Sequence, residues 1–210
     1  MTPTVYIVIG PAGSGKSTVG RRIARRHGAA YLDKDTLVTG FTELLLETNG
    51  FPRGDRDHNA YYQSVLLPLE YETLLKVCGD NLAVGSSVVL DAPFGRYFAD
   101  EHYLLAAARR HGWPAAEVIV VHVTVDGPAL RNRLVARGNP RDEWKIAHWQ
   151  EFWPQARANE CIWNGARHVI VDNSGGEADL AVLETGTPGA DPAGGPATAA
   201  RSAGRSTRSQ

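Results

Sequence analysis

Cysteine and long apolar runs are scarce in this chain. Two cysteines, Cys78 and Cys161, occur among 210 residues, too few for a disulfide-stapled domain. The apolar run at residues 5–9 is too short for the core of a signal peptide, and no positively charged segment precedes it. No stretch approaches the roughly 18 apolar residues of a membrane span. We therefore expect a cytoplasmic protein with free thiols and no membrane partner.

An excess of charge of either sign is also lacking. The chain has 22 Lys and Arg residues against 23 Asp and Glu residues, a formal net charge of −1. Nucleic-acid-binding domains usually carry a basic surface, so this balance argues against a nucleic-acid partner. The Asn-Lys-x-Asp tetrad with which GTPases recognise guanine is absent as well. The oligomeric state is left open by the sequence.

The last part of the chain lacks the residues that build a core. After Leu183 there is no Leu, Ile, Val, Met or aromatic residue, and residues 185–210 consist mainly of Gly, Pro, Ala, Ser and Thr. Such a segment cannot bury enough apolar surface to offset its loss of conformational entropy. We predict one folded domain over residues 1–184 and a disordered tail over residues 185–210. A basic arm is the alternative, based on three spaced arginines.

Within the predicted domain, short apolar segments alternate with longer amphipathic ones. The segments typical of strands cover residues 5–9, 29–32, 87–90, 118–123 and 168–171. The segments typical of helices cover residues 15–27, 36–48, 60–82, 100–111 and 128–137, with a further helical stretch after Trp144. This alternation predicts an α/β fold: a five-stranded parallel sheet with helices on both faces.

The first predicted strand runs into a complete phosphate-binding motif. Residues 10–17 match G-x-x-x-x-G-K-[ST] at every fixed position and lie between an apolar strand and an amphipathic helix. Glycines let successive backbone N–H groups turn toward phosphate oxygens, and the helix start adds its positive dipole end. We therefore expect ATP to bind at Gly10, Pro11, Ala12, Gly13, Ser14, Gly15, Lys16, Ser17 and Thr18.

Two residues of the motif have separate chemical roles. The ammonium of Lys16 should face the β- and γ-phosphates, and the Ser17 hydroxyl should ligate Mg²⁺.

A third candidate, Asp91, directly follows the apolar strand at residues 87–90. An acid in this place can support the metal; the alternative is that it caps a turn. Ala92 follows it where ATPase motors usually carry a second acid, which favours transfer to a hydroxyl over hydrolysis.

Two further carboxylates follow the second predicted strand. Asp33 and Asp35 are two residues apart, so in an extended chain they would lie on one side. One could help to place Mg²⁺, and the other could accept the proton of an incoming hydroxyl. We assign Asp33 to the metal and Asp35 to the acceptor as a catalytic base. The alternative is that Asp35 caps the following helix.

A basic segment at residues 137–145 has the pattern of a small lid. Arg133 and Arg137 lie four residues apart on one helix face, and a Gly-Asn-Pro turn leads to Arg141. A closing arginine can neutralise the charge that develops on the transferred phosphoryl group. We predict that Arg137 or Arg141 contacts the phosphates; a solvated helix end is the alternative.

These features, in this order, resemble the small P-loop kinases of the nucleoside-monophosphate-kinase type. The resemblance covers residues 5–173 and is greatest to the zeta-toxin-like and chloramphenicol-phosphotransferase-like group, with shikimate and gluconate kinases as cousins. It implies Mg·ATP as cofactor, the catalytic roles given above for Lys16, Asp35 and the lid arginines, and Asn173 beside the adenine. The long segment at residues 39–85 departs from the family pattern and is the natural acceptor-binding region.

The sequence therefore predicts an ATP-dependent kinase that phosphorylates a hydroxyl of a small molecule, either a metabolite or an antibiotic. Three alternatives remain at this point: a polynucleotide 5′-hydroxyl kinase, a toxin-type kinase of a nucleotide sugar, and a non-catalytic ATP-dependent switch. The acceptor itself is not identified by the sequence.

Overall fold

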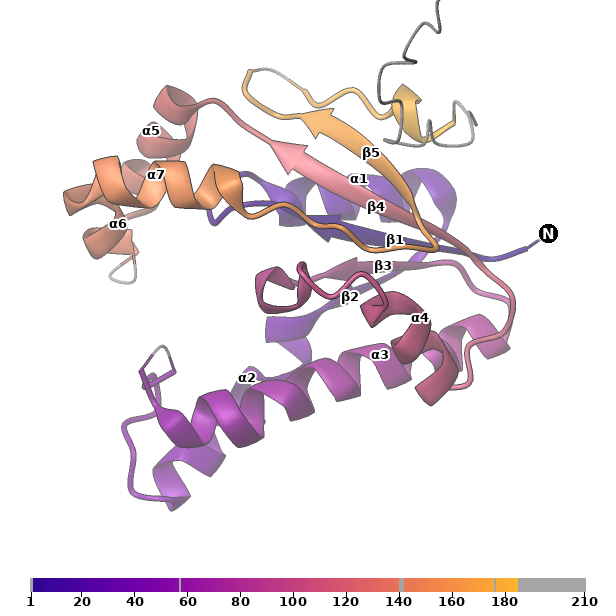
Figure 1. Ribbon diagram of the computed structural model, residues 1–210, viewed down its shortest axis with the longest axis horizontal. Helices are drawn as coiled ribbons and strands as arrows, with labels where there is room; N and C mark the ends of the chain where they lie inside the picture. The colour runs from indigo at the N-terminus through magenta and orange to yellow at the C-terminus, as the bar shows by residue number, and fades with distance from the viewer. Residues whose placement is uncertain (1, 57, 140–141, 176, 185–210) are drawn as a thin grey trace, which may run out of the picture.

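The computed structural model describes residues 2–56, 58–139, 142–175 and 177–184. Its centre is a five-stranded sheet of order β2-β3-β1-β4-β5, in which every neighbouring pair is parallel (Figure 1). The strands are β1 (Thr4–Ile9), β2 (Ala30–Asp33), β3 (Val88–Asp91), β4 (Glu117–Thr124) and β5 (Arg167–Asp172). The predicted parallel sheet is confirmed. The predicted tail and Arg141 lie outside the described residues.

Helices cover both faces of this sheet (Figure 1). They are α1 (Lys16–His27), α2 (Lys34–Thr48), α3 (Leu67–Ala83), α4 (Tyr103–Arg110), α5 (Gly127–Arg137), α6 (Glu143–Ala147) and α7 (Trp149–Ala158). Among the residues that the structure describes, no helix combines the length and hydropathy needed to cross a membrane.

Strand β1 shows how the sequence pattern builds two cores. Its side chains alternate between the two faces of the sheet because successive residues of a strand point in opposite directions. Val5 and Ile7 join a core formed with α3 and α4, whereas Tyr6 and Val8 join the core formed with α1. All four residues are buried. The sheet is thus held from both sides, and the loops at its carboxyl edge start from a fixed frame.

The helix predicted over residues 60–82 is not a uniform α-helix. Tyr62–Leu66 forms a π-helical turn, and Leu67 donates its backbone N–H to the carbonyl of Tyr62. Pro68, in the first turn of α3, has no N–H to donate to the turn before it. The spacing of apolar residues is too similar in α- and π-helical turns for the sequence pattern to distinguish the two.

The second and third strands each end one residue later than predicted, and this matters for the site. β2 includes Asp33 and β3 includes Asp91, and the two residues are register partners on neighbouring strands. Asp35 lies in the first turn of α2 and not in an extended segment. The expectation that Asp33 and Asp35 share one side of an extended chain is therefore wrong.

Candidate active site

The predicted phosphate loop sits at the carboxyl end of β1 and needs its three glycines. Gly10, Gly13 and Gly15 all have positive φ angles, of 149°, 85° and 90°. A Cβ atom at Gly10 would lie 2.5 Å from the backbone oxygen of Val123, and one at Gly13 would lie 2.8 Å from a methyl group of Leu134. Larger residues are excluded by both conformation and space, so the loop keeps the tight turn that a polyphosphate requires.

Two polar side chains of this loop have an environment suited to phosphate. The Ser14 hydroxyl is buried without a hydrogen-bond partner, and the Lys16 ammonium donates to the carbonyl of Pro11 over 2.9 Å. Burial lowers the pKa of Lys16; Asp91 opposes this shift, and Arg137 and Lys145 add to it. A triphosphate would supply the negative charge that this loop lacks, so the residues present fit ATP.

The proposed metal residues Ser17 and Asp91 meet around a tyrosine that the sequence analysis missed. Tyr31, on β2, donates its hydroxyl to Asp91 over 2.6 Å and is also hydrogen-bonded to Ser17. Burial raises the pKa of Tyr31, with the Asp91 carboxylate adding to the shift. Hydroxyl and carboxylate oxygens are ligands that Mg²⁺ accepts, alongside phosphates and water. The position of Tyr31, two residues before Asp33 on the same strand, was the feature of the sequence that could have predicted its place in the site.

The two aspartates at the exit of β2 have different environments. Asp33 caps α2: one of its carboxylate oxygens accepts the backbone N–H groups of Asp35 and Thr36, over 2.9 and 3.2 Å. The cap is therefore Asp33, and the alternative that Asp35 serves as the cap is wrong. The side chain of Asp35 is 67% exposed, with the Lys34 ammonium 3.1 Å from its carboxylate. It is available to a substrate.

Asn173 and an unpredicted arginine border the phosphate loop at the end of β5. The Asn173 side chain donates to the carbonyl of Ser14 over 2.7 Å, and its nitrogen would lie 2.3 Å from a Cβ atom at Gly15. Arg133, on α5, donates to the carbonyls of both Ser14 and Asn173. Its spacing from Arg137 marked it as sharing a helix face, but nothing in the sequence showed which arginine touches the loop.

The segment predicted as a lid, residues 137–145, is organised around a buried acid. Arg137 ends α5 and is paired with Asp142, which also accepts a hydrogen bond from Lys145 over 2.8 Å. Asp142 is fully buried. Arg137 is therefore held by the protein itself, a contact that sequence reasoning did not anticipate. The other predicted lid arginine, Arg141, lies outside the described residues.

The predicted acceptor region, residues 39–85, contains a buried polar cluster between α2 and α3. Glu70 is its centre, and it accepts hydrogen bonds from Lys34 over 2.5 Å, Thr42 over 2.7 Å and Tyr62 over 3.1 Å. Arg56 lies beside it, 7% exposed, with its guanidinium carbon 5.7 Å from the centre of the Tyr62 ring. Neither Glu70 nor Lys34 could be predicted as a site residue from local pattern, because the two are 36 residues apart in the sequence.

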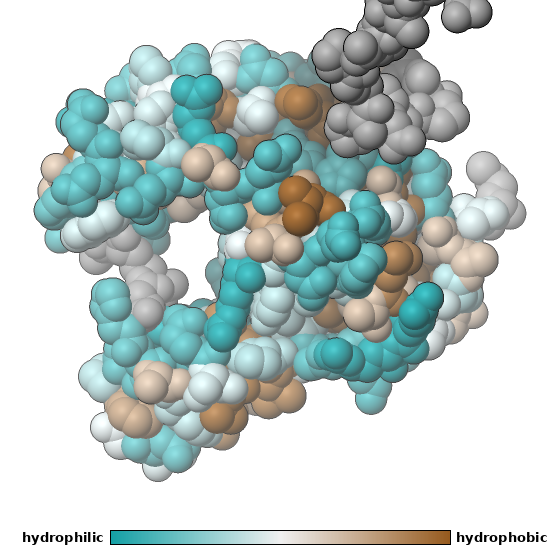
Figure 2. Space-filling view, viewed as in Figure 1, coloured by the Kyte–Doolittle hydropathy of each residue, from teal (hydrophilic) through white to brown (hydrophobic). Residues whose placement is uncertain are grey.

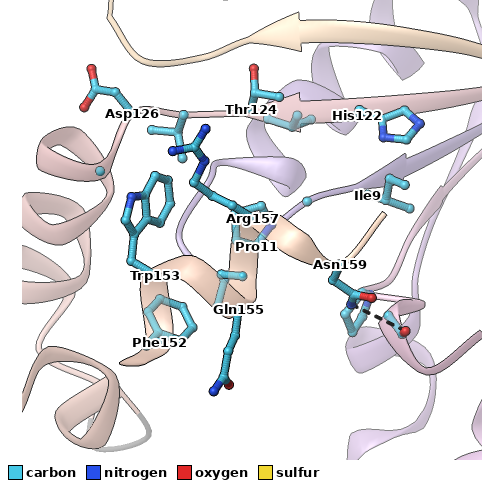
Figure 3. Close-up of a pocket in the computed structure, with 18 of the residues that line it drawn as sticks. Ile9, Pro11, His122, Thr124, Asp126, Phe152, Trp153, Gln155, Arg157 and Asn159 are labelled. Atoms are coloured by element: carbon cyan, nitrogen blue, oxygen red, sulfur yellow. Dashed lines mark hydrogen bonds between the residues drawn. The ribbon is translucent and has the colours of Figure 1, made fainter. Parts of the chain in front are cut away.

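A hollow separates this acceptor region from the end of the molecule that carries α5, α6 and α7 (Figure 2). A cavity of about 950 Å³ lies next to the phosphate loop, and its walls include residues 9–12 and the exit of β4. Figure 3 shows Phe152 and Trp153 of α7 opposite Thr124 of β4. The arrangement leaves room for an acceptor beside the phosphate loop.

The sequence of this chain matches a known protein family. Residues 5–173 match the family described as AAA domain. The chain belongs to this family. The match extends from the first buried residue of β1 to Asn173, so it includes every element of the site described above.

Curated relatives of similar size include shikimate kinases. The enzyme from Aromatoleum aromaticum is 27% identical and matches 82% of this chain and 86% of its own. The enzyme from Streptomyces avermitilis is 29% identical over 69% of this chain and 76% of its own. A bifunctional pantoate ligase/cytidylate kinase from a Synechococcus strain is 47% identical, but over 27% of this chain and only 12% of that protein.

Solved structures show the same fold. A putative kinase from Chloroflexus aurantiacus has a TM-score of 0.54 at 18% identity, covering 82% of this chain and 86% of that one. Shikimate kinase from Bacteroides thetaiotaomicron has a TM-score of 0.52 at 20% identity, covering 88% and 94%. At such identities the likeness concerns the fold alone.

Proposed function

We propose that this protein is an ATP-dependent kinase that transfers the γ-phosphate of ATP to a hydroxyl of a small, negatively charged metabolite in the cytoplasm. Its membership of the AAA-domain family and its shikimate kinase relatives support a small-molecule phosphotransferase. The observation that carries the choice of an anionic acceptor is a buried arginine next to the exposed Asp35.

Arg56 has donors that the protein leaves unused. Its Nε and Nη2 atoms are buried without a hydrogen-bond partner, and the nearest carboxylate, of Asp35, is 3.9 Å from Nη1. A buried guanidinium without partners is unfavourable, whereas a carboxylate or phosphate can accept two of its hydrogen bonds in parallel. An acceptor with such a group would satisfy Arg56 and present its hydroxyl near Asp35.

The proposed mechanism assigns one task to each part of the site. The loop around Lys16 holds the phosphates, Ser17 and Asp91 orient the metal, and Asp35 accepts the proton of the attacking hydroxyl. Mg·ATP supplies the phosphoryl group and neutralises part of its charge. Asp33 is proposed as a further metal residue, and through one of its oxygens it also caps α2, which fixes the position of Asp35.

Shikimate is the first acceptor to test, because it combines a carboxylate with hydroxyls and is named in the relatives' activity. Gluconate has the same two groups. The finer grouping with zeta-toxin-like and chloramphenicol-phosphotransferase-like enzymes is a proposal as well, and it would favour a nucleotide sugar or an antibiotic. A polynucleotide 5′-hydroxyl kinase and a non-catalytic switch are the remaining alternatives.

The experiment is a mass-spectrometric screen for the gain of one phosphate from Mg·ATP. The panel contains hydroxy acids and sugar phosphates, neutral polyols and antibiotics, nucleotide sugars, and oligonucleotides with a free 5′-hydroxyl. We expect a hydroxy acid or sugar phosphate to react. Phosphorylation confined to neutral compounds or oligonucleotides would show that the acceptor class is wrong, and no product at all would favour the switch.

Variants then test the two residues that define the acceptor site. Asp35→Asn should lower the transfer rate about 10²–10⁴-fold with near-normal ATP binding. Arg56→Met should raise the KM of the acceptor without changing the KM of ATP. Arg53→Met is the matched control, because Arg53 is exposed and paired with Glu47 over 3.2 Å. Equal effects of the Arg53 and Arg56 variants would remove Arg56 from the acceptor site.

A further inference from the structure

The acid between α5 and α6 holds two cations at once. Asp142 binds Arg137 through one carboxylate oxygen and Lys145 through the other, the latter over 2.8 Å. Burial alone would raise the pKa of Asp142, but the hydrogen bonds from Lys145 and Arg137 hold it below its usual range. The acid is therefore ionised at neutral pH, and two positive charges share a single negative one.

This group is placed beside the phosphate loop by the packing of α5. Leu130 and Leu134 lie within 3 Å of where a Cβ atom of Gly13 would be, so α5 lies directly against the loop. Arg133, on the same helix, already donates to the carbonyl of Ser14. Arg137 is one helical turn further along this face.

Helix α6 is fixed to the same surface. Ile146 packs against the cluster formed by Val125, Leu130 and Leu134, which brings the neighbouring Lys145 to the side of α5. The electrostatic influence of Arg137 and Lys145 on the ammonium of Lys16 agrees with this placement. Three cations therefore lie near the phosphate loop. Two of them, Arg137 and Lys145, are bound to Asp142, and the third, Lys16, is bound to a carbonyl.

We propose that Lys145 is a second phosphate-binding cation of the ATP site, and that Asp142 is the positioning residue that holds Lys145 and Arg137 toward the γ-phosphate. The inference rests on the proposed binding of ATP at the phosphate loop. An ammonium has three donors, so Lys145 can keep its bond to Asp142 while it donates to a phosphate oxygen. Arg137 uses its Nε–Nη2 edge for Asp142, which leaves the Nη1 side for a second acceptor.

The two nucleotides ATP and ADP provide the test, because only ATP carries the γ-phosphate. Calorimetric titration of Lys145→Met should show Mg·ATP binding weakened about tenfold, the usual size for one lost hydrogen bond to a charged group. Mg·ADP binding should change by less than about twofold. Lys145→Arg should restore most of the affinity for ATP. Lys76→Met is the control, since Lys76 is exposed on α3, away from the loop.

Asp142→Asn tests the positioning role. The amide keeps the shape of the side chain but loses the charge that holds both cations, so the preference for ATP over ADP should fall as in Lys145→Met. A general structural defect would weaken both nucleotides equally and lower the melting temperature. Tighter binding of ATP by Asp142→Asn would mean that the acid competes with the phosphate, which overturns the positioning role.

The outcomes separate this inference from the function on which it depends. If the wild-type protein does not bind Mg·ATP, the proposed function fails. If the wild type binds Mg·ATP and Lys145→Met binds it equally well, the function stands and the role of Lys145 is refuted.

Discussion

At the scale of single residues, the charge of Lys16 shows how the phosphate loop prepares for its ligand. The ammonium is held by the carbonyl of Pro11 and lies in a loop whose Ser14 hydroxyl has no partner. Both groups are left with weaker interactions than a phosphate oxygen would offer. The loop is therefore arranged for an anion before the anion arrives.

Replacement of this residue gives the first prediction. Lys16→Ala should weaken Mg·ATP binding by more than about tenfold, because it removes the point charge facing the β- and γ-phosphates. The melting temperature should stay within a few degrees of the wild type, since Lys16 contributes no packing to either core. Unchanged affinity in a folded variant would place the nucleotide elsewhere. Calorimetry and thermal unfolding measure the two effects.

The second prediction concerns His122, which faces His168 across strands β4 and β5 with 2.8 Å between their ring nitrogens. Burial, and then His168, lowers the pKa of His122 from 6.5 to about 4. Between these two values the unfolded chain binds a proton that the folded protein does not, so stability falls as the pH drops from about 6.5 to about 4. Above pH 6.5 the group has no effect.

His122→Gln keeps a nitrogen near the ring position of Nε2 but does not titrate. The melting temperature of the wild type should therefore drop more than that of His122→Gln when both are compared at pH 7 and pH 5. Groups that do not contact His122 titrate equally in the two proteins, so the difference between them reports on the pair of His122 and His168. Parallel curves would show that His122 is protonated equally easily in both states.

At the scale of elements, α2 and α3 are joined by charge as well as by packing. Lys34 is buried at the start of α2 and pairs with Glu70, which is buried in α3. Removal of one member leaves the other charge buried without compensation, which typically costs about 3–5 kcal/mol. The pair fixes the first turn of α2, and thereby Asp35.

The third prediction follows from this pair. Lys34→Met should destabilise the protein by about 3 kcal/mol in urea unfolding, because the Glu70 carboxylate loses its counter-charge. In the double variant Lys34→Met, Glu70→Gln, the amide oxygen can accept one of the hydrogen bonds from Thr42 and Tyr62, and the amide NH2 group can donate to the other hydroxyl, all without a charge. The double variant should thus be more stable than Lys34→Met alone. If it is less stable, the two residues contribute independently.

What could be predicted from the sequence depended on distance along the chain. The phosphate loop is eight consecutive residues with a strand before and a helix after it, so local pattern was enough for residues 10–17. Tyr31 and Asp91 are 60 residues apart, and Arg56 lies in the loop after α2, whereas Asp35 is in the first turn of that helix. Such pairs meet only through the strand order and the packing of α2 on α3, which no local pattern reports.

At the scale of the whole molecule, binding of the proposed nucleotide should stabilise the fold, because the phosphate loop is assembled only in the folded state. At a free concentration of 100 times its dissociation constant, Mg·ATP should add about 2.7 kcal/mol to the free energy of unfolding. The fourth prediction is a rise in melting temperature with Mg·ATP that is clearly smaller in Lys16→Ala. A rise of equal size in that variant would indicate binding outside the phosphate loop. Thermal unfolding over a series of nucleotide concentrations measures it.

The part of the proposed acceptor region that precedes α3 has a small core of its own, formed by Leu46, Tyr62 and Leu66, whereas α3 belongs to one of the two cores that hold the sheet. It is attached to β2, the strand at one edge of the sheet. Changes inside this region therefore need not disturb the nucleotide loop, which starts from the central strand β1. Evolution could change the acceptor while the nucleotide is kept, and an engineer could graft a foreign segment between residues 39 and 66 in the same way.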